Sequence, residues 1–285
     1  MNKVAVIILN YNTSSDCRKC ISFLKRQQGV ELEIIIIDNC SQANDCNKVE
    51  LLCQEQGSTF IPAKENRGYN AGNNIGLRYA AEKGYVYALI ANPDMEFPQT
   101  DYVAALVTAI NEDDDIVAIG SDIIGVDGVH QNPIKRDGNW RTNWEWTKDC
   151  FINKRKDPSH CFGEWSNSHY CDKISGCCLM VRIDFIKQVG FFDENVFLYC
   201  EEPILSRQVE QAGKRIYYLA SSQAIHRHIK SEKGNPVARF KQWKKSRTYF
   251  IDHYCGDSML GLLMAKLSIS FYVCLLYTSP SPRDG

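Results

Sequence analysis

Apolar residues in the first third of the chain occur in short continuous runs, separated by longer stretches of mixed pattern. The runs cover residues 4–9, 34–37 and 85–91. Runs of Val and Ile without polar alternation are typical of strands that are buried on both faces. The intervals between the runs are long enough for helices, so this part of the chain predicts βαβ units and a mostly parallel sheet.

Helix-like stretches with capping residues fill these intervals. We expect helices over residues 14–28, 44–57 and 70–83, beginning at Ser or Asn and two of them ending at Gly. Ser and Asn side chains accept hydrogen bonds from the free N–H groups of a helix start, and glycine commonly follows a helix end. The chain is therefore predicted to have an α/β fold.

The pattern is less regular in the middle of the chain. Residues 137–172 carry several tryptophans without a clear period, which predicts a long loop of the kind that is often functional in enzymes. Regular elements are expected on either side of it: short strands at 116–120 and 123–126, a strand at 174–182, a helix at 203–212 and a strand at 215–219.

The C-terminal part changes character. Residues 239–247 are basic and aromatic, and residues 259–277 are mostly apolar, with Lys266 as their only charge. A charge near the middle argues against a helix that simply spans a membrane. The pattern is typical either of an interfacial helix beside anionic head groups or of a helix that covers the core. Residues 277–285 continue no pattern, and we expect them to be a non-native tail.

Composition narrows the class of protein. Hydrophobic residues make up 44% and charged residues 24%, which is enough apolar side chain for a sizeable core and excludes a disordered chain. Lys and Arg number 33 against 34 Asp and Glu, so the basic excess of a nucleic-acid-binding protein is missing and no nucleic-acid partner is expected. The apolar run at 4–9 is too short for a signal peptide, so we expect the 13 cysteines to be reduced packing residues in the cytoplasm.

Two polar clusters stand where ligands bind in an open α/β sheet, at the carboxyl ends of strands. Asp38 directly follows the run at 34–37, where it can accept hydrogen bonds from a nucleotide base or ribose, or cap a turn. Glycines 68, 72 and 76 are four residues apart on one helix face, which predicts close approach to the sheet or to a diphosphate. The stretch is neither a dinucleotide-binding fingerprint nor a P-loop.

Two further clusters suggest chemistry. Asp94 ends an Asn-Pro-Asp sequence after the run at 85–91, where its carboxylate can bind a hard divalent cation, and His226 and His228 are later candidates for the same ion. Glu201 and Glu202 follow an apolar stretch. Adjacent carboxylates repel each other, so one of them is a candidate for proton abstraction, or both form an ordinary acidic helix start.

In this order, the clusters resemble the family-2 inverting glycosyltransferases of the GT-A fold, especially those that add sugars to bacterial surface polysaccharides. The resemblance runs from Lys3 to about His228. The matching stretches are VAVIILNYN at 4–12, DNCS at 38–41, NRGYNAGNN at 66–74, NPD at 92–94, SGCCLM at 175–180, VGFFDE at 189–194, the pair at 201–202, and His226.

The resemblance implies a GT-A domain over residues 1–235, with a mostly parallel central sheet flanked by helices. Its nucleotide-binding half is 1–100 and its acceptor half 101–235, followed by a helical extension at 236–276 that contacts the inner face of the membrane if it is interfacial. The implied partners are a nucleoside-diphosphate sugar, with dTDP or UDP as its nucleotide, and a glycan or lipid-linked acceptor. The implied contacts to the nucleotide sugar are Asn10, Asn12, Asp38, Asn39, Asn66, Gly68, Asn70, Asn73, Asn92 and Asp94.

The resemblance also implies a mechanism. Asp94 and His226 would hold Mg²⁺ or Mn²⁺, and Glu202, in the position of the family's Asp, would be the general base, with Glu201 as the other candidate. Two positions depart from the family pattern, because Asn92 replaces the first Asp of its metal motif and Ile204 replaces a later Asp. The alternatives are a nucleotidyltransferase, which normally has a glycine-rich basic loop after the first strand, and a non-catalytic relative that binds sugar nucleotides.

Overall fold

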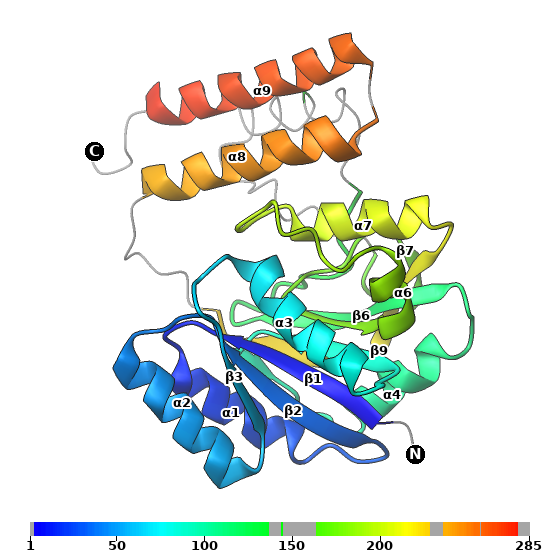
Figure 1. The fold of residues 1–285 in the computed structure, drawn as a ribbon. Coiled ribbons are helices and arrows are strands. Elements are labelled where there is room, and N and C mark those ends of the chain that lie inside the picture. The colour runs from blue at the N-terminus through cyan, green and yellow to red at the C-terminus, as the bar shows by residue number, and fades with distance from the viewer. Residues whose placement is uncertain (1–2, 137–143, 145–163, 229–235, 257, 279–285) are drawn as a thin grey trace.

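The structure is a computed structural model that describes residues 3–136, 144, 164–228, 236–256 and 258–278 (Figure 1). Nine strands form one sheet with the order β3-β2-β1-β4-β8-β6-β9-β5, and β7 pairs with β9 beside this path. Helices cover both faces of the sheet, which confirms the predicted α/β architecture. Most of the expected loop at 137–172, and residues 279–285 of the tail expected at 277–285, lie outside the described residues. The tail was expected to start two residues too early, because Tyr277 and Thr278 belong to the last helix.

Residues 1–100, the expected nucleotide-binding half, contain four parallel strands, of which the apolar runs predict three; the strand at 59–62 was not predicted. Their bounds are β1 (Lys3–Asn10), β2 (Glu31–Asp38), β3 (Thr59–Pro62) and β4 (Tyr87–Ala91). Alternate side chains of β1 enter two different core clusters, Val4 and Val6 on one face and Ala5 and Ile7 on the other. Burial on both faces explains why β1 is a continuous apolar run.

The second half of the sheet is mixed, which corrects the expectation of a mostly parallel sheet for this part. The strand β8 (Cys178–Arg182) runs antiparallel to both β4 and β6 (Ile116–Gly125). The long strand β9 (Arg215–His226) is parallel to β6 and antiparallel to the short strands β5 (Met95–Glu96) and β7 (His169–Cys171).

Three expected boundaries in this half were wrong. The two short strands expected at 116–120 and 123–126 are one strand, β6, which continues through the buried Ser121 and Asp122. Strand β8 begins at Cys178, four residues later than expected, because residues 174–177 form a turn. Strand β9 extends seven residues beyond Leu219, which brings His226 to the same edge of the sheet as Asp94.

The helices divide between the two faces (Figure 1). On one face pack α1 (Ser14–Leu24), α2 (Ala43–Gln56) and α4 (Tyr102–Ile110). On the other face pack α3 (Tyr69–Glu82), α6 (Ile183–Gln188) and α7 (Glu201–Gln211). The helices α4 and α6 were not predicted, whereas α1, α2, α3 and α7 lie within a few residues of the expected positions.

Helix α3 packs very close to β1. A Cβ atom added at Gly72 would lie 2.5 Å from Cδ1 of Leu9, and one added at Gly76 would lie 2.6 Å from Cγ2 of Ile7. These two glycines thus serve helix–sheet packing. The packing role expected for all cysteines holds for Cys17, which is fully buried in the core, but not for Cys40, which is exposed in the turn after β2.

The C-terminal residues form two helices, α8 (Pro236–Tyr254) and α9 (Met259–Thr278), which pack against each other beside α7 (Figure 1). They share a small apolar core with the segment that leads into α7. Its buried members are Val196, Cys200, Ile204, Phe250, Ile251, Ala265 and Ile269. One face of the helix pair therefore covers part of residues 101–235. Among the described residues, no helix combines the length and the hydropathy that a membrane crossing requires.

Candidate active site

The first part of the site lies where β1 and β2 end. Asn10 and Asp38 are register partners at the carboxyl ends of these parallel strands, and the Asn10 Nδ2 donates to Asp38 Oδ1 at 2.8 Å. The backbone N–H of Ser41 donates to Asp38 Oδ2 at 3.0 Å. Asp38 is 1% exposed, so its carboxylate holds the strand ends together in addition to any contact with a ligand.

Asn12 forms the rim of this region. Its φ of 59° lies in the left-handed region, which Asn tolerates better than most residues. Its backbone N–H donates to Ser41 Oγ at 2.9 Å, and its Oδ1 accepts from the N–H of Gln42 at 2.8 Å. The predicted residues Asn10, Asn12 and Asp38 are therefore joined into one polar cluster at the ends of β1 and β2.

Asn39 links this cluster to the start of α3. Its Nδ2 donates to Asn66 Oδ1 at 3.1 Å and to the carbonyl oxygen of Gly68 at 3.3 Å. The same Asn66 oxygen accepts from the Gly68 N–H at 3.0 Å. Three residues that the sequence predicts for nucleotide-sugar binding are thus in direct contact, although they come from separate loops.

Gly68 is required where α3 meets the segment before α7. Its φ is 96°, and an added Cβ would lie 2.0 Å from the carbonyl oxygen of Phe197. That oxygen accepts from the backbone N–H of Tyr69 at 2.9 Å. No side chain other than hydrogen fits in this backbone contact, so the start of α3 positions the segment that leads into α7.

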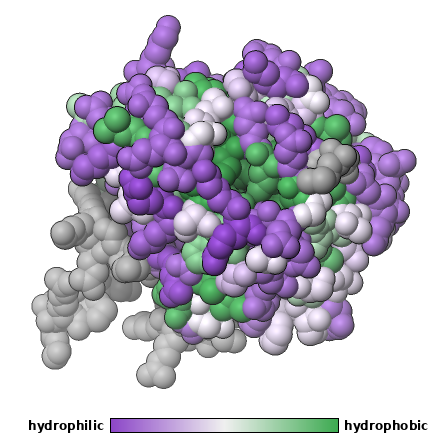
Figure 2. Space-filling model, turned by 90° about the horizontal axis from the view of Figure 1, so that it is seen from below, coloured by the Kyte–Doolittle hydropathy of each residue, from purple (hydrophilic) through white to green (hydrophobic). Residues whose placement is uncertain are grey.

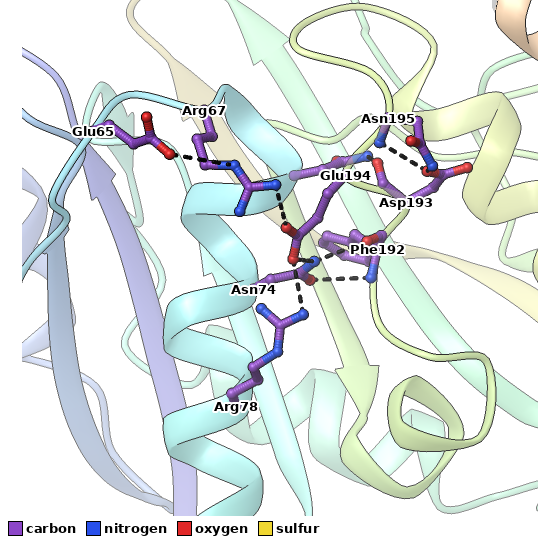
Figure 3. A network of polar contacts seen from close by, with 9 residues as sticks. Glu65, Arg67, Asn74, Arg78, Phe192, Asp193, Glu194 and Asn195 are labelled. Carbon is purple, nitrogen blue, oxygen red and sulfur yellow. Dashed lines mark hydrogen bonds and ion pairs between the residues drawn. The ribbon is translucent and has the colours of Figure 1, made fainter.

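The polar residues of α3 anchor the turn at 192–194, as Figure 3 shows. Asn74 exchanges hydrogen bonds with the backbone of Phe192 at 2.8 and 3.0 Å. Its Nδ2 also donates to Glu194, whose carboxylate in addition accepts from Arg78 at 2.8 Å and pairs with Arg67 at 3.2 Å. Burial raises the pKa of Glu194, but these hydrogen bonds and charges outweigh it and hold the pKa below its usual value.

Two predicted asparagines are buried in the same helix. The Asn70 Nδ2 donates to the carbonyl oxygen of Asp193 at 2.7 Å, and the Asn73 Nδ2 donates to that of Tyr69 at 3.0 Å. Both Oδ1 atoms are buried, and no donor among the described residues reaches them. Buried acceptors without a donor are costly, and a bound ligand or water could supply the missing donors.

The carboxylate pair begins α7. Tyr199 and Cys200 immediately before it have φ values of 71° and 66°, a conformation that is strained for residues with side chains. This turn places Glu201 and Glu202 in the first helical turn, where the positive end of the helix dipole favours negative charge. The N–H of Gly176 donates to Glu202 Oε1 at 3.3 Å.

Glu201 is the more enclosed of the two carboxylates. Its Oε2 is buried and has no partner among the described residues. Burial, and then the charge of Glu202, raise the pKa of Glu201 well above its usual range. Tyr69 lies beside the pair, and its hydroxyl donates to the carbonyl oxygen of Gly176. Burial, followed by the charges of both glutamates, raises the pKa of Tyr69 as well.

A second cluster contains Asp94, His226 and His228, whose ligand atoms all lie within 4.8 Å of one another. His226 Nε2 is 3.4 Å from Asp94 Oδ1, and His228 Nδ1 is 3.4 Å from Asp94 Oδ2. Burial lowers the pKa of His226, but contacts with Asp94 and Cys177 outweigh it and raise the pKa to about 10. Burial raises the pKa of Asp94, but the two histidines outweigh it and hold that pKa well below its usual range.

The donor atoms of this cluster suit a divalent cation. His226 Nδ1 lies 2.8 Å from Gln131 Oε1, so in the neutral ring that a metal ion requires, the proton would stay on Nδ1 and Nε2 would present its lone pair to the ion. His226 Nε2 is buried without a hydrogen-bond partner among the described residues. A buried imidazole nitrogen beside a carboxylate is the arrangement that a bound metal ion would satisfy.

The turn at 175–177 connects the two clusters. Gly176 contacts Glu202, and the carbonyl oxygen of Cys177 accepts from the backbone N–H of Asn92 at 2.7 Å. Asn92 also accepts from the N–H of Met95 at 3.2 Å through its backbone oxygen, and this contact shapes the loop that carries Asp94. The candidate metal cluster and the carboxylate pair therefore lie on either side of one short turn.

Sequence reasoning missed several residues of the site. Gln131 lies in an irregular segment with no motif, so only the tertiary structure shows that it orients His226. Tyr69 was matched as the aromatic residue of a motif, but its contact with Gly176 spans 107 positions of sequence. His228 was one of two candidate histidines, and the structure brings both of them to Asp94.

Comparison with known proteins identifies similar chains. The family model "Glycosyl transferase family 2" matches residues 5–172. The low-salt glycan biosynthesis hexosyltransferase Agl10 of Haloferax volcanii is 25% identical over 229 residues, which are 79% of this chain and 67% of that protein. The N-acetylglucosaminyl-diphospho-decaprenol L-rhamnosyltransferase of Mycobacterium tuberculosis is 24% identical over 273 residues, 88% of this chain and 85% of that protein.

Solved structures show the same fold. The mannosyltransferase PcManGT from Pyrobaculum calidifontis, in complex with GDP-Man and Mn²⁺, superposes with a TM-score of 0.60 at 13% identity. The match covers 98% of this chain and 76% of that one. At this identity the likeness speaks for the fold alone, and it confirms the GT-A architecture that the sequence motifs implied.

Proposed function

The chain belongs to glycosyl transferase family 2 and is a glycosyltransferase, and from this premise we propose that it transfers a sugar with inversion from a dTDP- or UDP-sugar to a glycan or lipid-linked acceptor in surface polysaccharide synthesis. The main support is that the carboxylate pair and the Asp94 cluster meet at the turn 175–177. Inversion needs one displacement only, because the acceptor hydroxyl attacks the face of the sugar opposite to the leaving diphosphate.

Glu202 is the general base in this proposal. An acceptor hydroxyl is a weak nucleophile at neutral pH, so a carboxylate has to take its proton as the new bond forms. The raised pKa of Glu201 means that this residue retains its proton to higher pH than an ordinary glutamate. Glu202 holds the position of the family's Asp, and its Oε1 accepts from the Gly176 N–H, which orients this carboxylate at the turn 175–177.

The nucleotide occupies the carboxyl ends of β1 and β2. Asp38 offers a fixed carboxylate there because Asn10 and Ser41 already hold both of its oxygens in place. Each carboxylate oxygen can accept a second hydrogen bond, so a base or ribose donor can be added without breaking the cluster. Asn12 on the exposed rim and Asn39 beside Asn66 complete the polar surface.

A divalent cation fits the cluster of Asp94, His226 and His228. Bound there beside the diphosphate, it would offset the negative charge that develops as the nucleoside diphosphate leaves. We infer that Mn²⁺ suits the site better than Mg²⁺, because Mg²⁺ prefers oxygen ligands and water, whereas two of the three donors here are imidazoles.

A ligand screen tests the proposal. Thermal unfolding would be followed with UDP-, dTDP- and GDP-sugars, each with Mn²⁺, with Mg²⁺ and without metal, because a ligand that binds only the folded state raises the midpoint. We expect a UDP- or dTDP-sugar with Mn²⁺ to give the largest shift. Binding without transfer to any acceptor would favour a non-catalytic relative, and release of pyrophosphate from a nucleoside triphosphate would favour a nucleotidyltransferase.

A further inference from the structure

The outer C-terminal helix exposes a row of large apolar side chains. Their spacing of three and four residues places them on one face of α9, while Ala265 and Ile269 on another face are buried against α8 and α7. The row consists of Leu260, Leu263, Leu267 and Phe271, which are 68%, 54%, 49% and 51% exposed. A contiguous exposed row of this kind is unusual on a surface that contacts water alone.

The charges beside this row favour one kind of partner. Arg239, Lys241 and Lys245 of α8 are exposed, and α8 lies between α9 and the body of the protein (Figure 1). Figure 2 shows the opposite side of the molecule, where hydrophilic residues surround a central apolar area. Helix α8 carries five basic residues, Arg239, Lys241, Lys244, Lys245 and Arg247, against one acidic residue, Asp252. The helix pair thus combines exposed leucines with a net positive charge, which matches a lipid surface with anionic head groups.

The inner side of the helix pair holds the segment that leads to the catalytic carboxylates. Asp193 Oδ2 accepts from the hydroxyl of Tyr249 at 2.8 Å and from that of Tyr254 at 2.7 Å. The Ser246 hydroxyl donates to the carbonyl oxygen of Leu198 at 2.7 Å. Helix α8 therefore makes hydrogen bonds to both ends of the segment 193–198.

Apolar contacts also join α8 to the residues that directly precede α7. Val196 and Cys200 are buried against Phe250 and Ile251 of α8. Glu201 directly follows the two residues with strained backbone, and a strained turn persists only when its surroundings hold it. The position of the catalytic pair therefore depends on the packing of α8 against the segment 193–200.

We propose that an anionic lipid surface binds the exposed row of α9 and that this binding stabilises the catalytic segment 193–204 through α8. A surface that binds only the ordered helix pair lowers the population of locally opened states, including those in which the segment 193–200 detaches. The carboxylate pair would then be fully ordered at the surface where a lipid-linked acceptor resides. This inference rests on the proposed transferase function and adds its partner and its regulation.

Sedimentation of the full chain with lipid vesicles tests the surface. We expect binding to vesicles of phosphatidylglycerol and phosphatidylcholine, and weaker binding to phosphatidylcholine alone. The double variant L263S/L267S should bind the mixed vesicles up to about tenfold more weakly, because the exposed halves of the two side chains together amount to about one whole leucine, whose burial contributes about a tenfold step in affinity. The matched control is Leu51→Ser, at an exposed leucine of α2, which should bind as the unaltered chain does.

Amide hydrogen exchange tests the coupling. Mixed vesicles should slow exchange at residues 193–204 in the unaltered chain. The double variant Y249F/Y254F lacks both hydrogen bonds to Asp193 and should bind vesicles normally, but its segment 193–204 should gain much less protection. Tyr170→Phe is the matched control, since it removes an exposed tyrosine hydroxyl bonded to Asp113 and should leave the protection unchanged.

Several results would overturn the inference. Equal sedimentation of the chain and L263S/L267S would remove the lipid surface as the partner of this row. A lower mass in solution for L263S/L267S than for the unaltered chain would assign the row to a second copy of the protein. Vesicle binding without slower exchange at 193–204 would refute the coupling. Both readouts are independent of sugar transfer, so a failed transferase assay would count against the proposed function alone.

Discussion

The backbone N–H of Gly176 donates to Glu202 Oε1 at 3.3 Å, and the carbonyl oxygen of Gly176 accepts from the hydroxyl of Tyr69. One glycine thus connects the start of α3 with the start of α7. A Cβ atom at this position would lie 3.4 Å from both Glu202 Oε1 and the Tyr69 hydroxyl oxygen. The three elements that form the carboxylate site are therefore positioned by direct contact.

Gly68→Ala should destabilise the protein severely. The new Cβ would clash with the Phe197 carbonyl oxygen at 2.0 Å, in addition to the strain of a φ of 96°. We expect the free energy of unfolding to fall by about 2–4 kcal/mol, measured by urea denaturation. Gly84→Ala is the control, because its φ is 76° but nothing lies within 4 Å, so it should cost only about 1–2 kcal/mol. Equal losses would show that the contact with Phe197 is unimportant.

Asp38→Ala should weaken nucleotide binding by about 1–3 kcal/mol, the cost of losing a hydrogen bond to a charged group. Calorimetry with UDP and dTDP measures this directly. The control is Asp45→Ala, because Asp45 also accepts from Asn10, at 3.0 Å, and from the Ser14 N–H at 3.1 Å. If both variants lose affinity equally, Asp38 acts only by holding the loops in place.

Metal-dependent binding should require Asp94 and His226. In Asp94→Ala and His226→Ala, we expect Mn²⁺ to add nothing to the thermal stabilisation by nucleotide, because the ion loses one of its two less exposed ligands. His228→Ala should keep part of the effect, since this side chain is 58% exposed. His169→Ala is the control, at a half-buried histidine outside the cluster. A full Mn²⁺ effect in His226→Ala would remove this residue from the site.

Glu201→Gln should stabilise the protein increasingly as pH rises. The raised pKa of Glu201 means that the folded state still holds a proton that the unfolded chain releases above about pH 4.3. Stability from this residue is therefore present at low pH and is lost as pH rises toward the folded pKa. Urea denaturation at about pH 5 and about pH 8 measures how far the free energy of unfolding of the variant exceeds that of the unaltered chain. We expect this difference to be larger at the higher pH, by about 1.4 kcal/mol for each pH unit between these values that lies below the folded pKa. If the variant is stabilised by the same free energy at both pH values, the pKa of Glu201 is not raised in the folded state.

The sequence predicts the parts of the fold that rest on local apolar pattern and fails where polar contacts replace it. Strands β1 and β2 were predicted because both of their faces are buried. The continuation of β9 past Leu219 was missed because Ser221, Ser222 and Gln223 interrupt the apolar pattern. Gln223 is held instead by Asp122 of the neighbouring strand, through a hydrogen bond of 3.0 Å that spans 101 positions.

The same distinction applies to the site. Asp38, Asp94 and the pair at 201–202 could be selected because they occupy motif positions at strand or helix ends. The roles of Gln131 and of Tyr249 depend on contacts between residues far apart in the chain, which no local pattern encodes. The sequence left two interpretations open for the C-terminal helices. The contacts of Phe250 and Ile251 show that these helices cover part of the core, whereas contact with a membrane stays a prediction.

Glu202→Gln is the decisive variant for catalysis. The amide keeps the size of the side chain, and its Oε1 can still accept from the Gly176 N–H, so the fold and donor affinity should be unchanged. It cannot accept the proton of the acceptor hydroxyl, and removal of a general base typically costs about 10²–10⁴ in rate. We therefore expect sugar transfer to fall by that factor while the thermal shift with nucleotide sugar and Mn²⁺ is retained.

Glu201→Gln separates the two candidates. Glu201 Oε2 is buried without a partner among the described residues, and burial followed by the charge of Glu202 raises the pKa of Glu201, so a neutral amide resembles its protonated form. This variant should keep most of the transfer rate near neutral pH, because it alters only the residue that already holds a proton. If Glu201→Gln is inactive and Glu202→Gln transfers normally, the roles are reversed. If both variants transfer at the unaltered rate, neither carboxylate is the base, and the hydroxyl proton leaves by another group.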